Sequence, residues 1–170
     1  MTHDYSGKIP QTTNRDQPLY TSALSTPVNT DLTFKGGTVI QDDGSHVSFK
    51  DVTLQAVLVT VSQVKRIVQT EIQGRPGTVK EYIGMGDYNI TIDGTIAGGN
   101  GRYPADEVRT LKTALDVTAP IDVVSRYLQA LDIHAVVISD YTLDQEPGGY
   151  SQQRFTINCI SDAVATVQII

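Results

Sequence analysis

The sequence predicts an α+β fold: a mainly antiparallel β-sheet or barrel-like module with one α-helix and an extended N-terminal arm. Alternating apolar and polar residues recur from residue 32 onward, and Gly-containing turn signals separate the runs. Only one segment, near residues 104–115, has clear helical spacing. We therefore expect residues 1–34 to form an extended or disordered arm and residues 35–170 to form a single β-rich domain.

Composition argues against several classes of function. The formal charge is -6 and no run of Lys or Arg forms a basic face, so we expect no specific nucleic acid partner. We find no N-terminal basic segment followed by an apolar stretch, and no run of about 18 apolar residues. We therefore expect neither a signal peptide nor membrane insertion. Cys159 stands alone, which indicates a buried strand cysteine made in a reducing cytoplasm.

The N-terminal arm is rich in Thr, Gln, Asn, Ser, Asp and Pro, with isolated apolar residues. Such spacing cannot by itself form an amphipathic helix or bury one face of a strand. Two interpretations remain: a tail without a structural role, or an arm that grips a neighbouring subunit. On the second interpretation, deleting residues 1–34 leaves a folded monomer but weakens assembly.

Alternation begins with Leu32 and Phe34, and turn signals follow at Gly36-Gly37 and Asp43-Gly44. Apolar residues then occupy both faces of a strand near residues 52–61. Strands with two apolar faces are typical of the middle of a sheet, so we expect this strand to be central.

A long hairpin is predicted from residues 65–73 and 78–96, joined by the turn residues 74–77. In its second strand Tyr88, Ile90, Ile92 and Gly94 alternate with polar residues. One face of this strand should therefore be apolar and the other solvated.

The predicted helix near residues 104–115 has Pro104 at its start, acidic residues in its first turn and Val108, Leu111 and Leu115 on one side. Residues 121–131 fit either a helix or a strand followed by a turn, and the second is favoured. Two further strands flank Gly148-Gly149, and residues 165–170 suggest a last strand.

No catalytic, cofactor or metal site is predicted, and we expect no enzymatic activity. His3, His46 and His134 lie far apart in sequence without metal-ligand spacing. The loop at Gly98, Gly99 and Gly101 lacks the Lys-Ser/Thr of a phosphate-binding loop, so a flexible strand-to-helix connection is favoured.

Carboxylates have local explanations in turns or at the helix start. They are Asp42, Asp43, Asp106, Glu107, Asp140, Asp144 and Glu146. The last three also lack the pattern of a calcium loop, and Ser125, Ser139 and Ser161 lack a nucleophile elbow.

Four segments, taken in order, resemble a family of tail-module proteins of tailed bacteriophages and related particles. They are "GRPGTVKEYIGMGDYNITIDGTI", "GRYPADEVRTLKTAL", "PIDVVSRYLQALDIHAVVISDYTL" and "FTINCISD". The resemblance covers about residues 50–170 and leaves the arm unmatched. The segments are also similar to the β-rich domain that some baseplate proteins carry beside a LysM repeat, although no such repeat is visible here.

The resemblance implies a structural subunit of a phage tail or baseplate, made in the host cytoplasm and located in the virion. Its implied partners are other tail or baseplate subunits and further copies of itself in a ring. Two alternatives stay open: an adaptor at the neck or tail terminus, and a carbohydrate- or surface-binding β module. The second would use tyrosines as a platform, namely Tyr82, Tyr88, Tyr103, Tyr127, Tyr141 and Tyr150.

Overall fold

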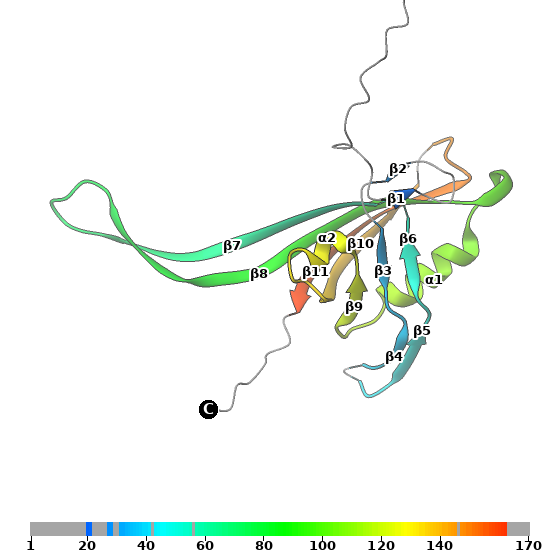
Figure 1. The fold of residues 1–170 in the computed structure, drawn as a ribbon, viewed down its shortest axis with the longest axis horizontal. Coiled ribbons are helices and arrows are strands. Elements are labelled where there is room, and N and C mark those ends of the chain that lie inside the picture. Colours follow the sequence, from blue (N-terminus) through cyan, green and yellow to red (C-terminus); the bar gives the residue numbers. More distant parts are fainter. Residues whose placement is uncertain are drawn as a thin grey trace, which may run out of the picture.

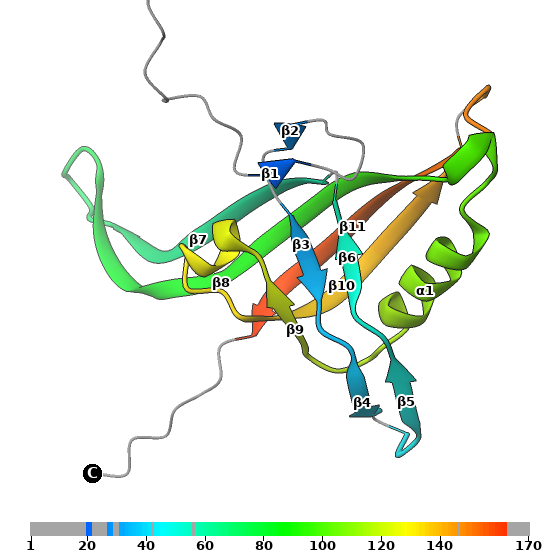
Figure 2. The ribbon, with the colours of Figure 1, turned by 45° about the vertical axis from the view of Figure 1, so that its right-hand side comes forward.

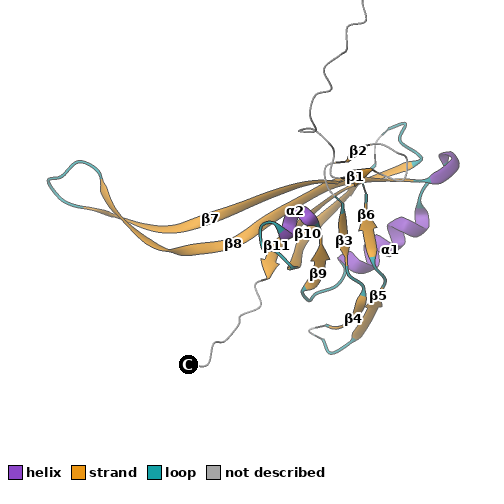
Figure 3. Cartoon of the chain, viewed as in Figure 1, coloured by secondary structure: helices purple, strands orange, loops and turns teal. Residues whose placement is uncertain are grey.

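The computed structural model is mainly antiparallel β-sheet with few helices (Figures 1 and 3). It describes residues 20–21, 27–28, 31–41, 43–55, 57–145 and 147–162. A 7-stranded sheet with the strand order β6-β3-β9-β10-β11-β8-β7 dominates the described residues. Its strands are β3 Leu32–Phe34, β6 Val52–Leu54, β7 Val57–Glu71, β8 Thr78–Ala97, β9 Ile121–Val124, β10 Ala135–Asp144 and β11 Gln152–Asp162.

Smaller elements surround this sheet. Two 2-stranded sheets pair β1 with β2 and β4 with β5, and the β4–β5 turn contains Gly44 with φ +80, as its Asp-Gly signal predicts. The elements are β1 Tyr20–Thr21, β2 Pro27–Val28, β4 Gly37–Ile40, β5 His46–Phe49, the 3-10 helix η1 Gly99–Gly101, α1 Ala105–Leu115 and α2 Arg126–Gln129.

The two edges of the large sheet are consecutive in sequence. β6 ends at Leu54 and β7 begins at Val57, yet they lie at opposite ends of the strand order. Because three residues span at most about 11 Å, the sheet must curl until its edges come close. The prediction of one central strand over residues 52–61 is therefore wrong: the chain breaks into two edge strands, and Leu58 on β7 is 61% exposed.

One hydrophobic core lies inside the curled sheet. Figure 2 shows β3, β6 and β9 crossing in front of β8, β11 and β10, with α1 beside them. Side chains from all these layers belong to one buried cluster. Its largest fully buried members include Leu32, Phe34, Ile90, Ile92, Leu111, Ile121, Leu128, Phe155 and Ile157.

The helix predicted near residues 104–115 is confirmed as α1, with Pro104 at its N-cap position. Leu111 and Leu115 are buried, and α1 contacts β5 and β6. In the ambiguous segment the strand is confirmed as β9, whereas the residues after it form the short helix α2 instead of a simple turn. Burial of Leu128, which anchors α2 in the core, accounts for that extra turn of helix.

The boundary placed between residues 34 and 35 needs correction. β3 pairs with β6 on one side and β9 on the other, and Leu32 and Phe34 are both 0% exposed. These residues belong to the domain because their burial supplies part of its core. The rest of the arm, apart from β1, β2 and Asp31, and the strand suggested at residues 165–170 lie outside the described residues.

Candidate functional site

The most unusual feature of the described chain is the length of the β7–β8 hairpin. β8 pairs with β11 only from Asn89 to Ala97, whereas its pairing with β7 continues out to Thr78. The far part of the hairpin therefore projects beyond the other strands as a two-stranded ribbon (Figure 1). We call residues 63–88 the projecting hairpin.

Turn chemistry sets the end of this hairpin. Gly74 and Gly77 have φ values of +79 and +88, in the left-handed region that glycine occupies without strain. The turn predicted at residues 74–77 is thus confirmed. Gly-Arg-Pro-Gly lets the chain reverse at this point, and β7 and β8 then pair with each other along the ribbon.

Two irregularities in pairing occur along the projecting hairpin. Register partners step from Gln63↔Tyr88 to Lys65↔Met85, and from Arg66↔Gly84 to Ile67↔Tyr82. At each step β8 holds one residue more than β7, which is the arrangement of a β-bulge. Bulges increase the local twist, and Figure 1 shows the two strands crossing over one another along the projection.

Apolar side chains lie on both faces of the projecting hairpin. Ile67 is opposite Tyr82 and shares its face with Met85, because Met85 pairs with Lys65 and alternate residues of a strand share a face. Val64 and Val68 alternate with Ile67 and therefore lie on the other face, while Ile72 directly follows the end of β7. All of these side chains are exposed, as are Val79 and Ile83.

This exposure calls for an explanation beyond the isolated chain. A two-stranded hairpin is marginally stable in water by itself, and exposed apolar patches on soluble proteins commonly mark interaction sites. Both free strand edges also carry backbone groups that can pair with another chain. The projecting hairpin is therefore the best candidate for a protein-binding surface among the described residues.

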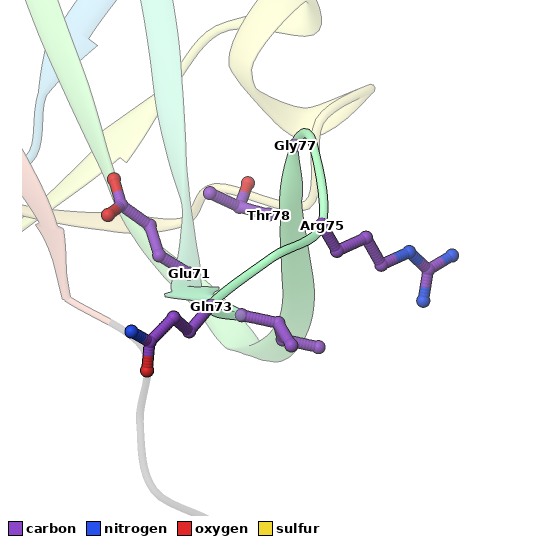
Figure 4. A pocket seen from close by; sticks show the side chains of 6 residues that line it. Glu71, Gln73, Arg75, Gly77 and Thr78 are labelled. Atoms are coloured by element: carbon purple, nitrogen blue, oxygen red, sulfur yellow. The ribbon is translucent and has the colours of Figure 1, made fainter.

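The turn of the hairpin also surrounds a shallow, open hollow. Its lining residues are Glu71, Ile72, Gln73, Arg75, Gly77 and Thr78. Figure 4 shows the side chains of Glu71, Gln73 and Arg75 pointing in different directions. Polar groups that diverge in this way cannot hold a small ligand between them, so the hollow reflects the shape of the turn.

The solvated face predicted for residues 88–95 is confirmed. We define the outer face as the side of β8, β11 and β10 that points away from the core. Side chains on it form cross-strand hydrogen bonds: Thr91 Oγ1 donates to Asn158 Oδ1 at 2.9 Å, and Asn158 Nδ2 donates to Asp140 Oδ1 at 2.7 Å. Thr156 Oγ1 likewise donates to Asp93 Oδ1 at 2.6 Å.

The two histidines in the described residues belong to no group of metal ligands. His46 lies exposed in β5, and His134 Nε2 is 3.2 Å from Asp132 Oδ1 at the surface, while His3 is outside the described residues. In the described ranges, no three His, Cys, Asp or Glu side chains are placed to hold a metal ion. No helix in the same ranges is long and apolar enough to cross a membrane.

The glycine-rich connection after β8 has a structural role. A Cβ on Gly98 would lie 1.8 Å from the carbonyl oxygen of Arg102, so only glycine fits this close backbone approach. Asn100 has φ 57 and closes the 3-10 turn. The segment is thus a strand-to-helix connection, as the sequence favoured, and its flexibility stays a prediction.

The serines and the cysteine serve in strands or their connections. Ser161 Oγ accepts a hydrogen bond from the backbone N–H of Tyr88, and Ser139 Oγ donates to the carbonyl of Asn158. Ser125 is buried just before α2. The buried strand cysteine is confirmed: Cys159 is 2% exposed, and burial, assisted by the negative charge of Asp140, raises the pKa of its thiol to about 12.

Of the carboxylates singled out, Asp43 and Asp106 have the local roles expected of them. Asp43 Oδ1 accepts a hydrogen bond from the N–H of Ser45, and hydrogen bonding by the side chain of Ser45 and by this N–H lowers the pKa of Asp43. Asp106 and Glu107 lie in the first turn of α1. Asp140 is different, because it joins the hydrogen-bonded ladder of the outer face. Asp42 and Glu146 lie outside the described residues.

Comparison with known protein families identifies the family of this chain. The model of a family described as a domain of unknown function, DUF6046, matches residues 53–170. This chain belongs to the DUF6046 family. The match includes β7, β8, α1, β9, α2, β10 and β11, and hence the whole projecting hairpin. No curated protein matches the chain.

Sequence reasoning found the hairpin but missed what makes it a candidate site. The signal was present in residues 64–72, where Val64, Ile67, Val68 and Ile72 place apolar side chains on both faces. The same pattern is typical of a strand buried inside a sheet. Only the pairing of β8 with β11, which stops at Asn89, shows that this part of the ribbon extends past the core.

Proposed function

We propose that this chain is a structural subunit of a phage tail or baseplate that acts by protein–protein assembly and has no enzymatic activity. The observation that carries the assembly role is the projecting hairpin, whose exposed apolar residues lie on both faces. A ribbon of this kind gains stability when another protein covers it. The choice of a phage particle rests on the resemblance of residues 50–170 to tail-module proteins.

The N-terminal arm is proposed as a second contact with a neighbouring subunit. Its polar composition suits a segment that becomes ordered over another surface. β3 is excluded from this role, because its side chains fill the chain's own core. The arm and the hairpin together would give one subunit two separate contacts with its neighbours in a ring. The protein would be made in the host cytoplasm and would be located in the virion.

A carbohydrate-binding module is less well supported. Tyr88 and Tyr141 pack against the core, and Tyr82 lies in the projecting hairpin. Tyr103 precedes α1, Tyr127 lies in α2 and Tyr150 lies in the β10–β11 turn. Rings so distributed over separate elements do not favour a single aromatic platform. A neck or terminator adaptor is an assembly role of the same class, and its position along the tail would distinguish it.

The test removes the projecting hairpin without disturbing the core. Residues 66–84 are replaced by Asn-Gly, which closes a two-residue turn between the register partners Lys65 and Met85. Circular dichroism and thermal unfolding should show a folded domain. In the particle that encodes the chain, electron microscopy should then show tails that are missing or incomplete, and antibody labelling should place the wild-type chain on the tail.

The matched control replaces exposed Ile40 in β4 with Ser, which removes one exposed apolar residue outside the hairpin. Normal tails are expected from this variant. Particles that carry the shortened hairpin in full amount and retain normal tails would contradict the proposal. Absence of the labelled wild-type chain from purified tails would contradict it as well.

A further inference from the structure

Charge is distributed unevenly between the hairpin and the rest of the chain. Residues 63–88 contain four basic and three acidic residues, a net charge of +1, while the remaining nine basic and sixteen acidic residues give -7, which together make -6. The basic residues of the hairpin are Lys65, Arg66, Arg75 and Lys80, and the acidic ones are Glu71, Glu81 and Asp87. The projecting hairpin therefore carries a small positive charge, whereas the rest of the chain is acidic.

Two of the basic residues share a face of the hairpin with exposed apolar side chains. Lys65 pairs with Met85, Ile67 with Tyr82 and Gln69 with Lys80, and alternate residues of β7 lie on the same side. We call this side the Lys65/Lys80 face. It offers two ammonium groups around an exposed cluster of Ile67, Tyr82 and Met85, and Glu71 lies on the same side near the turn, so the face keeps a net positive charge.

The outer face of the sheet has the opposite charge. Asp93, Asp140, Asp144 and Asp162 lie on it, and the one basic residue on the same strands and side is Arg154. It also offers an apolar patch, because Val137 and Ile160 are register partners and both are exposed. Leu58, opposite Asp93 on β7, adds a third exposed apolar side chain.

We propose that the Lys65/Lys80 face of the hairpin docks on the outer face of a second copy of this chain. This inference rests on the proposed function and names the partner of its hairpin. The two surfaces complement each other in charge, and each has an apolar patch that the contact would cover.

The contact has to be intermolecular. β7 and β8 belong to the same hydrogen-bonded sheet as the outer face and continue directly out of it. The hairpin of a chain therefore cannot fold back over its own outer face without breaking strand pairing. A second copy of the chain supplies an outer face on which the hairpin can dock.

The dimensions of the two surfaces also agree. Residues 64–71 of β7, at about 3.3 Å per residue, make a ribbon about 26 Å long. β11 has 11 residues, so the outer face is about 36 Å long by the same measure. The hairpin of one copy can thus lie entirely on the sheet of the next.

This interface joins two different surfaces, so each copy keeps one free hairpin and one free outer face after pairing. Contacts of this head-to-tail kind form rings if the rotation closes and filaments if it does not. Association through the docked charges should weaken as salt concentration rises, because ions screen charges at the protein surface.

The test uses two complementary variants of the full chain. The hairpin variant carries Lys65→Glu with Lys80→Glu, and the face variant carries Asp140→Lys with Asp162→Lys. Analytical ultracentrifugation over a range of concentrations measures association. Each variant alone should dissociate at roughly tenfold higher concentration than wild type, or more, because opposite charges are replaced by like charges.

Mixing the two variants gives the decisive measurement. The unchanged hairpin of the face variant can dock on the unchanged outer face of the hairpin variant, and the reversed hairpin can likewise dock on the reversed face. An equimolar mixture should therefore associate about as strongly as wild type, with the two variants alternating. A chain with all four substitutions should regain wild-type association, because its charges are exchanged rather than lost. A mixture that stays monomeric, or a four-fold variant that does not associate, would overturn the proposal.

Controls separate charge at this interface from charge in general. Lys50→Glu with Arg102→Glu matches the hairpin variant, and Asp106→Lys with Glu107→Lys matches the face variant; all four residues are exposed elsewhere. If reversal at Asp140 disturbs folding, Asp140→Asn with Asp144→Asn keeps the hydrogen-bond acceptors and removes the charge. Equal loss of association in the controls would overturn the proposed location.

Failure of this proposal can be distinguished from failure of the proposed function. A wild-type chain that stays monomeric at all concentrations, yet is found on tails that need its hairpin, would overturn docking on a second copy and leave the tail-subunit proposal standing. Self-association by docking of the hairpin, with the chain absent from tails, would support the interface and contradict the tail assignment.

Discussion

Ile67 and Tyr82 lie opposite each other on β7 and β8, share one face of the projecting hairpin, and are 46% and 60% exposed. In the body of the sheet the equivalent apolar pair, Val61 and Ile90, packs into the core. The same two strands thus first build a core and then continue beyond it. Beyond the core, the side chains are no longer buried, although the two strands still pair and still carry apolar residues.

Replacing both residues, Ile67→Ser with Tyr82→Ser, should leave the free energy of unfolding within about 1 kcal/mol of wild type, because neither side chain is buried. Assembly should fall strongly, since the exposed cluster is lost. Thermal unfolding and ultracentrifugation measure the two effects. Ile40→Ser is the control, and a double variant that assembles like wild type would rule out this face as an interface.

Ile90→Asp should prevent folding. Ile90 is 1% exposed, and an unpaired carboxylate at such a position costs several kcal/mol, roughly 4 or more, out of a total stability of about 5–15 kcal/mol. The neighbouring control, Asn89→Asp, lies on the exposed side of the same strand and should keep the wild-type melting temperature. Native-like circular dichroism and melting in Ile90→Asp would disprove the assignment of faces.

Gly94→Ala should destabilise the domain by about 1–3 kcal/mol through overpacking. A Cβ at this position would lie 2.5 Å from Cζ of Phe155 and 2.9 Å from Cγ1 of Val57. Adding Phe155→Leu should recover part of the loss, because it removes the atom in closest contact. Gly84→Ala, where a Cβ meets nothing within 4 Å, should be neutral in the same urea titration.

Stability should fall at alkaline pH partly through Cys159. Burial raises the pKa of the folded thiol to about 12, whereas an unfolded cysteine has a pKa of about 8.5. Between these values the unfolded chain releases a proton that the folded chain keeps, so unfolding becomes easier by up to about 1.4 kcal/mol per pH unit. The contribution is fully present below the unfolded pKa.

The comparison with Cys159→Ala isolates this effect from other groups that titrate at high pH. The variant should be less stable at pH 7 because a small cavity is left, yet it should lose less stability than wild type between about pH 8.5 and 10. Urea unfolding at several pH values provides the measurement. Parallel pH profiles for the two proteins would show that Cys159 ionises in the folded state as readily as in the unfolded state.

Features with local causes could be predicted from the sequence. The turn at Gly74 and Gly77, the start of α1 after Pro104 and the alternation around Ile90 each depend on residues close together in the chain. The break between β6 and β7 and the edge position of β7 could not be predicted. They depend on which strands pair across the sheet. β3 and β9 follow β6 in the strand order and separate it from β10, and both come from other parts of the sequence than β6 and β7.

Truncation at the N-terminus gives a test of where the domain begins. The chain lacking residues 1–34 should fail to fold, because it loses β3, the strand between β6 and β9, together with the fully buried Leu32 and Phe34. Losing two such side chains costs about 2–5 kcal/mol each, which is comparable to the whole stability of a domain. The chain lacking residues 1–30 keeps β3 and should unfold cooperatively near the wild-type temperature. If both truncations melt alike, β3 contributes little to the core, and the boundary between arm and domain lies after residue 34.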